Sequence, residues 1–200
     1  MDKIRIGIVG YGNLGRGVQY ASAQNADTEV VAVFTRRAPE SVKTVLPVKV
    51  EKYEDMKNYV GKIDVMILCG GSATDLPAQS AEIAGLFNTV DSFDTHAKIP
   101  EYFAALDKSA KDAGHLSAMS IGWDPGLFSL ARIYFGSSLA DGSTYTFWGK
   151  GVSQGHSDAI RRVKGVRDAR QYTVPVESAL ERVRRGENPQ LMIYTDMTMY

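Results

Sequence analysis

The sequence predicts an α/β protein in which a doubly wound parallel sheet is followed by a partial α+β domain. Three observations support this prediction. Short apolar runs rich in β-branched residues alternate with segments of helical spacing up to about residue 122, which is typical of parallel strands joined by helical crossovers. A glycine-rich turn directly follows the first apolar run. After residue 126, polar and aromatic residues alternate, as they do in half-exposed strands.

The apolar runs of the first half are short and continuous, which is typical of parallel strands that are buried on both faces. Strands are expected, in chain order, over residues 4–9, 29–34, 48–50, 63–68, 88–90 and 116–121. Helices are expected between them over residues 13–24, 54–59, 74–84 and 100–113. Pro77 falls in the first turn of the third helix, where its missing N–H costs little, and Gly114 closes the fourth.

The second half has longer alternating segments and fewer helices between them, which favours an antiparallel sheet. Helices are expected over residues 126–135 and 176–185, strands over residues 143–148 and 171–176, and a turn or loop over residues 149–151. Gly186 is expected to end the last helix. We therefore expect two domains, residues 1–122 and residues 123–200.

Composition excludes several classes of protein. The chain has 23 basic and 23 acidic side chains, so it lacks the positive surplus typical of nucleic-acid binders. No apolar run approaches the roughly 18 residues that a membrane span needs, and the N-terminus leads directly into a strand. The single cysteine, Cys69, rules out an intrachain disulfide and fits a reducing compartment. No His, Cys and Asp cluster has metal-ligand spacing, so we expect no metal, and we expect a cytoplasmic, soluble protein.

The segment Gly10-Tyr11-Gly12-Asn13-Leu14-Gly15 matches G-x-G-x-x-G between an expected strand and an expected helix, which predicts a Rossmann-type dinucleotide-binding domain. Gly10 permits the tight turn, Gly12 lets the backbone approach a pyrophosphate, and Gly15 allows close packing of helix and strand. The free N–H groups near Asn13 and Leu14 would face the phosphates. The alternative is a glycine-rich turn without a ligand.

The end of the second strand bears on the choice of cofactor. NAD-binding proteins place Asp or Glu there, about 20 residues after the glycine motif, to hold the ribose 2′-OH. This chain has Thr35-Arg36-Arg37 instead. An acid would repel a 2′-phosphate, whereas arginine binds one with two hydrogen bonds, so we predict NADP. The alternative is that both arginines lie in a solvated turn.

Small residues follow the fourth strand and leave room for the ribose and the nicotinamide. The residues expected to contact the cofactor here are Cys69, Gly70, Ser72, Ala73 and Thr74. Ser72 and Thr74 can donate hydrogen bonds or, alternatively, cap the next helix. Cys69 is expected to be a buried small residue rather than a nucleophile.

Two aspartates follow strands at the edge where open α/β sheets bind ligands. Asp94 follows the strand that ends at Val90, and Asp124 follows the strand that ends at Ile121. A pair of carboxylates beside a nicotinamide can hold a substrate ammonium group and stabilise an iminium as hydride leaves. The alternative for each aspartate is a helix N-cap.

Four segments closely resemble meso-diaminopimelate dehydrogenases. These segments are GYGNLGR near the N-terminus, WDPG, TFWG followed by SQGHSDA, and GVRDARQYTVP, and the likeness runs from residue 4 to about residue 190. The resemblance implies an NADP-dependent oxidative deamination of meso-2,6-diaminopimelate at its D-centre. The product is L-2-amino-6-oxopimelate, and the reverse reaction feeds lysine and cell-wall synthesis. The resemblance also implies a homodimer, with residues 123–200 forming part of a substrate-binding and dimerisation domain.

The resemblance assigns roles to matching positions in this chain. Asp94 and Asp124 would contact the amine of the D-centre. The further substrate-binding positions would be Phe147, Trp148, Ser153, Gln154, Gly155 and Thr173. The alternative for Phe147 and Trp148 is that they belong to the hydrophobic core of a mixed sheet. The segment around Ser153, Gln154 and Gly155 is expected to be a loop. His156 lies in this loop and is expected to be structural rather than a catalytic base.

The likeness breaks at two places. Lys150 stands where the family tends to have proline, and the final residues LMIYTDMTMY do not resemble the expected continuation. Family members are considerably longer, and the missing part supplies side chains for the distal L-centre. We therefore expect a truncated or frame-altered chain with weak or no dehydrogenase activity. Two other readings stay open, namely a non-catalytic NADP-binding remnant and another NADP-dependent oxidoreductase.

Overall fold

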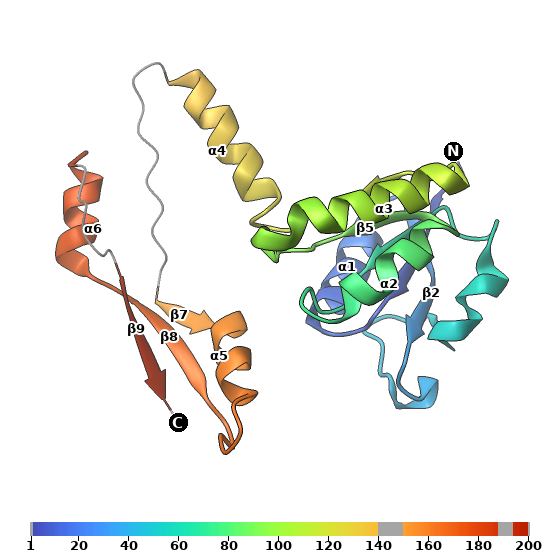
Figure 1. Cartoon of the computed structure of the whole chain (residues 1–200), viewed down its shortest axis with the longest axis horizontal. Coiled ribbons are helices and arrows are strands. Elements are labelled where there is room, and N and C mark those ends of the chain that lie inside the picture. The colour runs from blue at the N-terminus through green and yellow to red at the C-terminus, as the bar shows by residue number, and fades with distance from the viewer. Residues whose placement is uncertain (1, 140–149, 188–193, 200) are drawn as a thin grey trace. The chain divides into compact units, whose positions relative to one another are not determined.

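The computed structural model describes residues 2–139, 150–187 and 194–199, and the chain divides into two compact units, Met1–Phe135 and Gly136–Tyr200 (Figure 1). The domain border expected after residue 122 stays a prediction. Among the described residues, no helix is both long enough and apolar enough to cross a membrane.

The first unit is built around a six-stranded parallel sheet with strand order β3-β2-β1-β4-β5-β6. Its strands are β1 (Ile4–Val9), β2 (Thr28–Thr35), β3 (Lys49–Lys52), β4 (Val65–Leu68), β5 (Asn88–Asp91) and β6 (Ser117–Ala118). The order reverses between β1 and β4, and ligands of such sheets bind at this switch point, beyond the carboxyl ends of the strands. The predicted doubly wound parallel sheet is therefore confirmed.

Helical segments connect these strands, and α4 (Leu127–Ser138) follows the last of them and extends into the second unit. The connecting segments are α1 (Asn13–Ala23), η1 (Pro39–Ser41), η2 (Tyr53–Tyr59), α2 (Asp75–Ala84), η3 (His96–Lys98) and α3 (Ile99–Ala113). Two expectations need correction. The helix expected over 54–59 is a 3-10 helix, and the last strand has two residues, Ser117–Ala118, in place of the expected six. The expected stop at Gly114 is confirmed by its left-handed φ of 71°.

Apolar clusters fill both faces of the parallel sheet. On one face, Leu76 of α2 and Leu106 of α3 join a cluster with Phe34 and Met66 of the strands. On the other face, Ile8 and neighbouring strand residues pack with partly buried side chains that include one from α1. Burial of each large apolar side chain contributes about 1.5–3 kcal/mol to the stability of the fold. The helices α2 and α3 lie side by side (Figure 1).

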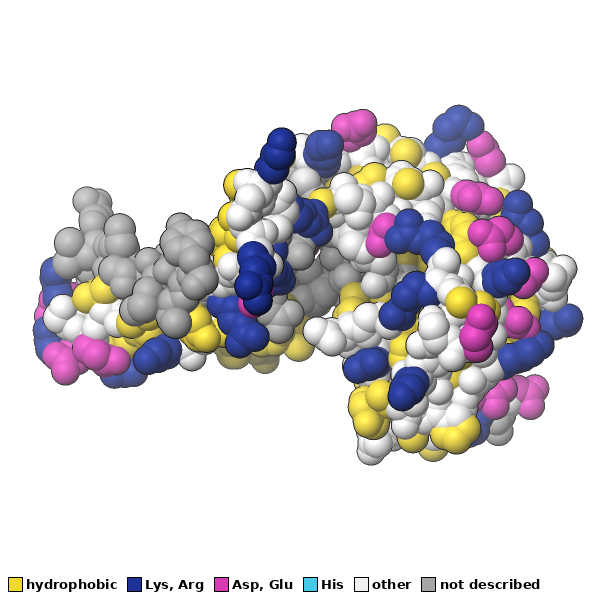
Figure 2. Space-filling view, turned by 90° about the horizontal axis from the view of Figure 1, so that it is seen from below, with side chains coloured by type: hydrophobic (Ala, Val, Ile, Leu, Met, Phe, Trp, Pro, Cys, Tyr) yellow, Lys and Arg dark blue, Asp and Glu magenta, His cyan; other side chains and the backbone are white. Residues whose placement is uncertain are grey.

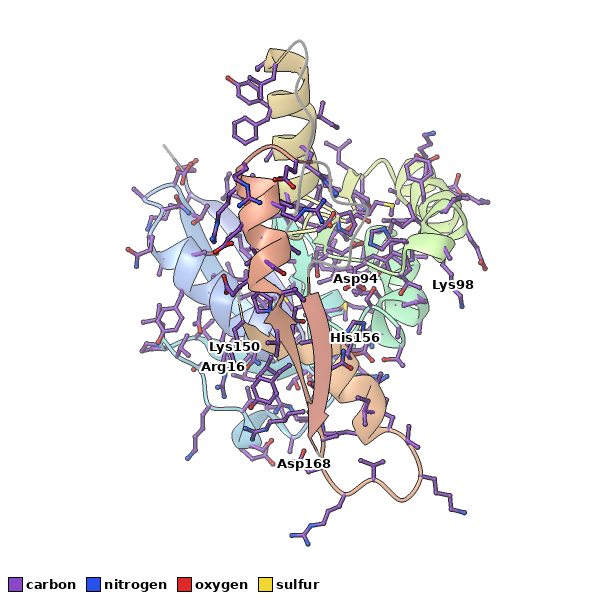
Figure 3. The ribbon with its side chains drawn as sticks, turned by 90° about the vertical axis from the view of Figure 1, so that its left-hand side faces the viewer. Arg16, Asp94, Lys98, Lys150, His156 and Asp168 are labelled. Atoms are coloured by element: carbon purple, nitrogen blue, oxygen red, sulfur yellow. The ribbon has the colours of Figure 1, made fainter. Side chains whose placement is uncertain are left out.

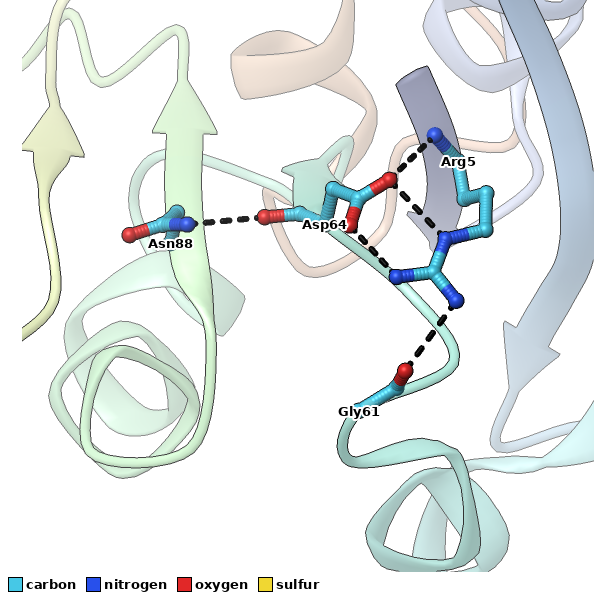
Figure 4. A network of polar contacts seen from close by, with 4 residues as sticks. All are labelled: Arg5, Gly61, Asp64 and Asn88. Atoms are coloured by element: carbon cyan, nitrogen blue, oxygen red, sulfur yellow. Dashed lines mark hydrogen bonds and ion pairs between the residues drawn. The ribbon is translucent and has the colours of Figure 1, made fainter. Parts of the chain in front are cut away.

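A polar network joins three strands at their amino ends, opposite the ligand edge (Figure 4). The Nη2 atom of Arg5 lies 2.6 Å from Oδ1 of Asp64, and the Arg5 backbone N–H donates to Oδ2 at 2.8 Å. Arg5 also donates to the carbonyl of Gly61, and Asn88 donates to the carbonyl of Asp64. Hydrogen bonds from the side chain and backbone of Arg5 lower the pKa of Asp64 to about 2. The network fixes β1, β4 and β5 at this end of the sheet.

The second unit contains an antiparallel sheet of order β7-β8-β9 and two helices. Its described elements are β7 (Gly151–Ser153), α5 (Gln154–Arg161), β8 (Arg170–Pro175), α6 (Glu177–Arg184) and β9 (Tyr194–Met199). The expected strand near 171–176 and the helix that stops at Gly186 are confirmed, and Gly186 has a φ of 77°. The strand expected over 143–148 lies outside the described residues.

Two expectations for the second unit are wrong. The segment that begins at Gln154 was expected to be a loop, but it forms α5. Gly151 was placed in a turn, but it begins β7. Ser157 explains the helix, because its buried hydroxyl donates to the carbonyl of Ser153 and accepts the backbone N–H of Gln171. This contact with β8 orders a Gly- and Ser-containing segment whose own helix propensity is low.

Candidate dinucleotide site and substrate-binding residues

The glycine turn at the end of β1 has the geometry of a dinucleotide site. Gly10 has a φ of 88°, and a Cβ atom there would lie 3.2 Å from the Cys69 carbonyl group. A Cβ atom on Gly15 would collide with the carbonyl oxygen of Gly10, so this glycine lets α1 pack on the turn. A Cβ atom on Gly12 would meet nothing within 4 Å. Gly12 therefore faces open space, which is where a pyrophosphate would approach.

The start of α1 supports the same reading. Gly12 is the N-cap residue and forms no side-chain capping bond, and the first turn carries no acidic residue. The first N–H groups of a helix have no partner within the helix, and the helix dipole favours an anion there. Asn13 and Leu14, which begin α1, are exposed. These residues can therefore hold a phosphate group as the sequence predicts.

The buried side chain of Tyr11 stabilises the glycine turn through hydrogen bonds, a role that the glycine motif alone does not reveal. It is 4% exposed, and its hydroxyl bonds to Gln19 of α1 and accepts the backbone N–H of Val45. Its own carbonyl accepts a hydrogen bond from Nη2 of Arg37 at 2.9 Å. One signal for this network was in the sequence, because Gln19 is a polar residue on the buried side of an amphipathic helix.

Both arginines after β2 have partners, so they do not form a purely solvated turn. Arg37 contacts the glycine turn through Tyr11, and its backbone N–H donates to Oγ1 of the buried Thr35 at 3.1 Å. Arg36 pairs with Asp75 of α2, with 2.6 Å between Nη2 and Oδ1. The Arg36 side chain is still 61% exposed, so much of its guanidinium faces solvent. An anion at this edge can reach it.

A small cavity of about 30 Å³ lies at the ends of β1, β2 and β4. Its lining includes Gly10, Thr35, Arg36, Tyr53, Gly70 and Asp75. The Tyr53 hydroxyl is buried and has no hydrogen-bond partner among the described residues, and burial raises its pKa to about 12. A buried unpaired hydroxyl is costly unless a ligand or a water completes it. The open space at Gly12 fits a bound dinucleotide, whereas the cavity that Tyr53 lines has room for about one water molecule.

The loop after β4 is organised by Asp75, which the sequence analysis did not single out. Oδ2 of Asp75 accepts the N–H of Gly71 at 2.9 Å, and a Cβ atom on Gly70 would lie 2.7 Å from the Asp75 Cβ. Burial opposes ionisation of Asp75, but the bonds from Gly71 and Arg36 outweigh it and hold its pKa below the ordinary value. Thr74 is the N-cap residue of α2 and makes no side-chain capping bond.

The other predicted cofactor contacts of this loop are Cys69, Ser72, Ala73 and Thr74. Ala73 and Thr74 are exposed, and the thiol of Cys69 lies against the carbonyl of Ile67. Burial raises the pKa of the Cys69 thiol to about 12, which fits an unreactive small residue. Ser72 is not a helix cap, because its hydroxyl accepts the backbone N–H of Asp94 at 2.8 Å. Ser72 therefore joins the cofactor loop to a candidate catalytic residue.

Asp94 lies in the segment between β5 and η3, where it is labelled with Lys98 in Figure 3. It is exposed, and its carboxylate forms no hydrogen bond or ion pair within the described part of the chain. The N-cap residue of η3 is Thr95, so Asp94 does not cap this helix. Its carboxylate is available to a ligand.

Asp124 lies just before α4 and is bound by side chains of that helix. Its Oδ1 atom accepts a hydrogen bond from the Ser129 hydroxyl at 3.1 Å and lies 2.9 Å from Nη2 of Arg132. Arg132 also lies over the Phe128 ring, 4.7 Å from its centre. Asp124 therefore contacts side chains rather than capping the helix backbone. Its side chain is 29% exposed, so it remains accessible.

The predicted substrate residues of the second unit fall around β7, α5 and β8. Ser153 ends β7, and its hydroxyl lies 2.9 Å from Nδ1 of His156. Gln154 and Gly155 begin α5. Thr173 lies on β8 opposite Gly151, two residues along the strand from the partner of Ser153. Phe147 and Trp148 lie outside the described residues.

Within the ranges that the structure describes, no three His, Cys, Asp or Glu side chains gather closely enough to hold a metal ion. On the face of the first unit shown in Figure 2, basic and acidic side chains are interspersed.

Comparison with known proteins defines the class and then the family. Residues 4–97 match the model of an oxidoreductase family with an NAD-binding Rossmann fold, so the first unit carries the nucleotide-binding domain of an oxidoreductase. Residues 122–199 match the C-terminal domain of diaminopimelic acid dehydrogenase. The chain belongs to the diaminopimelate dehydrogenase family, which confirms the resemblance seen in the sequence.

Individual relatives agree with this assignment. The chain is 62% identical to the meso-diaminopimelate D-dehydrogenase of Ureibacillus thermosphaericus over 191 residues, which are 96% of this chain and 59% of that protein. The Corynebacterium glutamicum diaminopimelate dehydrogenase in complex with DAP matches with a TM-score of 0.87 and 44% identity, over 99% of this chain and 62% of that chain. An engineered D-amino acid dehydrogenase bound to NADP+ matches with a TM-score of 0.82 and 43% identity, over 98% of this chain and 60% of that chain. The chain thus spans about three fifths of the length of these relatives.

Proposed function

We propose that this chain acts in the NADP-dependent oxidative deamination of meso-2,6-diaminopimelate at its D-centre. In this reaction meso-diaminopimelate, NADP+ and water give L-2-amino-6-oxopimelate, ammonium, NADPH and a proton. The observation that carries the proposal is the 62% identity to a meso-diaminopimelate D-dehydrogenase over almost the whole of this chain. The reverse reaction would supply a precursor for lysine and cell-wall synthesis.

The proposed cofactor is NADP rather than NAD. No carboxylate stands at the end of β2, where it would hold a ribose 2′-OH, and the exposed Arg36 stands there instead. Arg36 and Arg37 would bind the 2′-phosphate with charge-assisted hydrogen bonds. When bound, NADP+ supplies the acceptor for the hydride. The proposed cofactor contacts are Gly10, Gly12, Asn13, Leu14, Gly15, Thr35, Arg36, Arg37, Cys69, Gly70, Ser72, Ala73 and Thr74.

Asp94 and Asp124 are proposed to hold the D-centre amine. The Asp94 carboxylate is exposed and forms no bond with any described residue, while only Oδ1 of Asp124 is bonded among those residues. Both carboxylates can therefore accept hydrogen bonds from a substrate ammonium group. Hydride can leave only after the ammonium group has lost a proton, because the nitrogen needs a free electron pair to form the C=N bond. The negative charge of the two carboxylates would then favour the iminium, because positive charge develops on the nitrogen that they hold.

The rest of the substrate is proposed to contact the domain that begins at residue 123. Ser153, Gln154 and Gly155 would hold a carboxylate, because the backbone N–H groups at the start of α5 suit an anion. Thr173 would help to hold the distal L-centre. Phe147 and Trp148 would line the pocket. These roles come from the family resemblance and from the placement of the described residues on β7, α5 and β8.

We also propose that the active form is a cytoplasmic homodimer. Support comes from α4, where large apolar side chains are exposed, a feature that marks interaction surfaces. Leu130 is 64% exposed and Ile133 is 70% exposed. Sedimentation equilibrium of the purified protein should give twice the chain mass, and a monomer at assay concentrations would refute the dimer.

An initial-rate assay tests the proposed reaction. The purified protein is supplied with NADP+ or NAD+ and, in turn, with meso-diaminopimelate, its LL isomer, sugars and amino-acid semialdehydes. We expect NADPH to form with the meso isomer and NADP+ alone, at the weak rate that the sequence predicts. Oxidation of a sugar or semialdehyde instead would support another oxidoreductase. Cofactor binding without turnover of any substrate would support a non-catalytic protein.

A further inference from the structure

Asp91 is a buried carboxylate at the ligand edge of the parallel sheet to which no role has been assigned so far. It is the last residue of β5, is 2% exposed, and precedes Asp94 by three positions. Among the described residues no lysine or arginine pairs with it. Burying a carboxylate without a cation is costly, so its hydrogen bonds must compensate for the lost water.

The two oxygens of Asp91 connect three separate segments. Oδ1 accepts the backbone N–H of Phe93 at 2.9 Å and the backbone N–H of Ser120 at 3.1 Å. Oδ2 accepts a hydrogen bond from the Tyr102 hydroxyl of α3 at 2.7 Å. Phe93 directly precedes Asp94, and Ser120 lies four residues before Asp124. One side chain thus links the two segments that carry the candidate carboxylates.

Further contacts strengthen the same link. The backbone N–H of Ile121 donates to the carbonyl of Asp91 at 2.8 Å, and the Ser120 hydroxyl donates to the carbonyl of Phe93 at 2.8 Å. Ser120 has a φ of 58°, a left-handed conformation that residues other than glycine seldom adopt without such support. The backbone turns here from β6 toward Asp124, so Asp91 stabilises the turn that sets the direction of the segment.

Tyr102 orients Asp91 from the opposite side. Its hydroxyl lies 2.6 Å from the Ser80 hydroxyl, and its ring stacks on Phe93 with 4.0 Å between the ring centres. The Tyr102 hydroxyl is within donating distance of both Oγ of Ser80 and Oδ2 of Asp91, and because a carboxylate can only accept, Tyr102 supplies the hydrogen bond to Oδ2. Burial raises the pKa of Tyr102, which keeps this proton in place. The chain from Ser80 of α2 to Asp91 fixes the carboxylate in one orientation.

We propose that Asp91 is a positioning residue that holds the Asp94 segment and the Asp124 segment in one fixed arrangement. The inference rests on the proposed function for its catalytic consequence, but the positioning itself can be measured without turnover. An apolar side chain at this place would leave the backbone N–H groups of Phe93 and Ser120 without their acceptor, so the carboxylate itself holds the two segments. A site that uses both Asp94 and Asp124 needs their carboxylates at a fixed distance from each other. Hydrogen bonds from one carboxylate to both segments provide this constraint.

The test compares Asp91→Ala, Asp91→Asn and Tyr102→Phe with Asp112→Asn, a control on the exposed side of α3. The amide of Asp91→Asn keeps an oxygen for Phe93 and Ser120, and Tyr102 can turn its proton to Ser80. Tyr102→Phe keeps the ring that stacks on Phe93. Hydrogen exchange is followed by mass spectrometry over residues 92–94 and 119–124, together with NADPH binding and the kcat and KM for meso-diaminopimelate.

We expect Asp91→Ala to speed exchange in both segments by at least about tenfold, because buried acceptors of two backbone N–H groups are lost. NADPH should still bind one per chain, which shows that the protein is folded, while kcat falls by about a hundredfold. Asp91→Asn should stay near the parent protein in both measurements. Tyr102→Phe should speed exchange in both segments by a smaller factor, and this variant decides the matter if Asp91→Ala does not fold.

Exchange that changes in only one segment, or equally throughout the first unit, would overturn the proposal. A loss of kcat matched by an equal loss of NADPH-binding capacity would also overturn it, because that pattern means fewer folded molecules. If the parent protein has no turnover, the proposed function fails, and the exchange data still decide whether Asp91 joins the two segments.

Discussion

The guanidinium of Arg36 lies 2.6 Å from the carboxylate of Asp75, although 39 positions separate the two residues. The pair joins the end of β2 to the start of α2 across the ends of the strands, beside the small cavity that Tyr53 lines. Asp75 occupies one Nη atom of Arg36, and the exposed remainder of the guanidinium is available to an anion. A ribose 2′-phosphate is the anion that NADP would bring to this edge.

Arg36→Ala should weaken the binding of NADPH and leave that of NADH nearly unchanged. Loss of a charge-assisted hydrogen bond costs about 1.5–3 kcal/mol, so the dissociation constant for NADPH should rise by about 10- to 100-fold. Fluorescence titrations with both nucleotides measure the effect. Arg167→Ala, which removes an exposed arginine from the second unit, is the matched control. Equal losses for both nucleotides would argue against a 2′-phosphate contact.

Gly12→Ala and Gly15→Ala form a matched pair within one motif. A methyl group on Gly12 enters open space, so the fold should keep its melting temperature while NADPH binding weakens by at least about tenfold. A methyl group on Gly15 collides with the Gly10 carbonyl, so this variant should be destabilised by about 1–3 kcal/mol. Thermal unfolding and NADPH titration together separate the two effects. An unchanged NADPH affinity for Gly12→Ala would contradict the assigned phosphate position.

Cys69 should resist alkylation in the folded protein. Burial raises its pKa to about 12, so almost no thiolate forms near pH 8, and the reaction with iodoacetamide should be at least about a hundredfold slower than in the unfolded chain. Mass spectrometry at timed intervals gives both rates. Modification of the folded protein at the unfolded rate would show that the thiol is accessible and ionised.

Asp64 should contribute pH-dependent stability through Arg5. Its folded pKa of about 2 lies below the unfolded value of 3.8, so the contribution is present above the unfolded pKa and is lost as the pH falls toward 2. The pair is partly exposed, so the contribution is at most about 1 kcal/mol, or about 2–4 °C in melting temperature. Asp64→Asn should melt lower than the parent at neutral pH and no differently near pH 2. Asp27→Asn, on an exposed aspartate, is the control.

Much of the first unit could be predicted from its local pattern. The strand Ile4–Val9 is rich in β-branched apolar residues, with Arg5 as its one charged residue, and the glycine motif directly follows it. Helix α5 was missed because its stability depends on Ser157 bonding to β8, a contact between distant positions. The strand Ser117–Ala118 is shorter than its apolar run suggests, because the chain turns at Ser120 to reach Asp91.

The candidate site was predictable where a motif carries the chemistry and not where the fold supplies it. The glycines, the two arginines and the two aspartates stand at positions that follow strands. Asp75 and Asp91 could not be predicted, because each accepts hydrogen bonds from backbone N–H groups, which no side-chain pattern reveals. Asp91, for example, accepts the backbone N–H of Ser120, which is distant in sequence. Tyr102 lies near the start of an amphipathic helix, where a buried aromatic residue suggests core packing alone.

Titration of the purified protein with NADPH, followed by nucleotide fluorescence with and without meso-diaminopimelate, tests the central claim most directly. The account predicts saturable binding of one NADPH per chain and a change in signal or affinity when meso-diaminopimelate is added. Binding that ignores meso-diaminopimelate would contradict the proposed substrate site, and absence of NADPH binding would contradict the dinucleotide site itself.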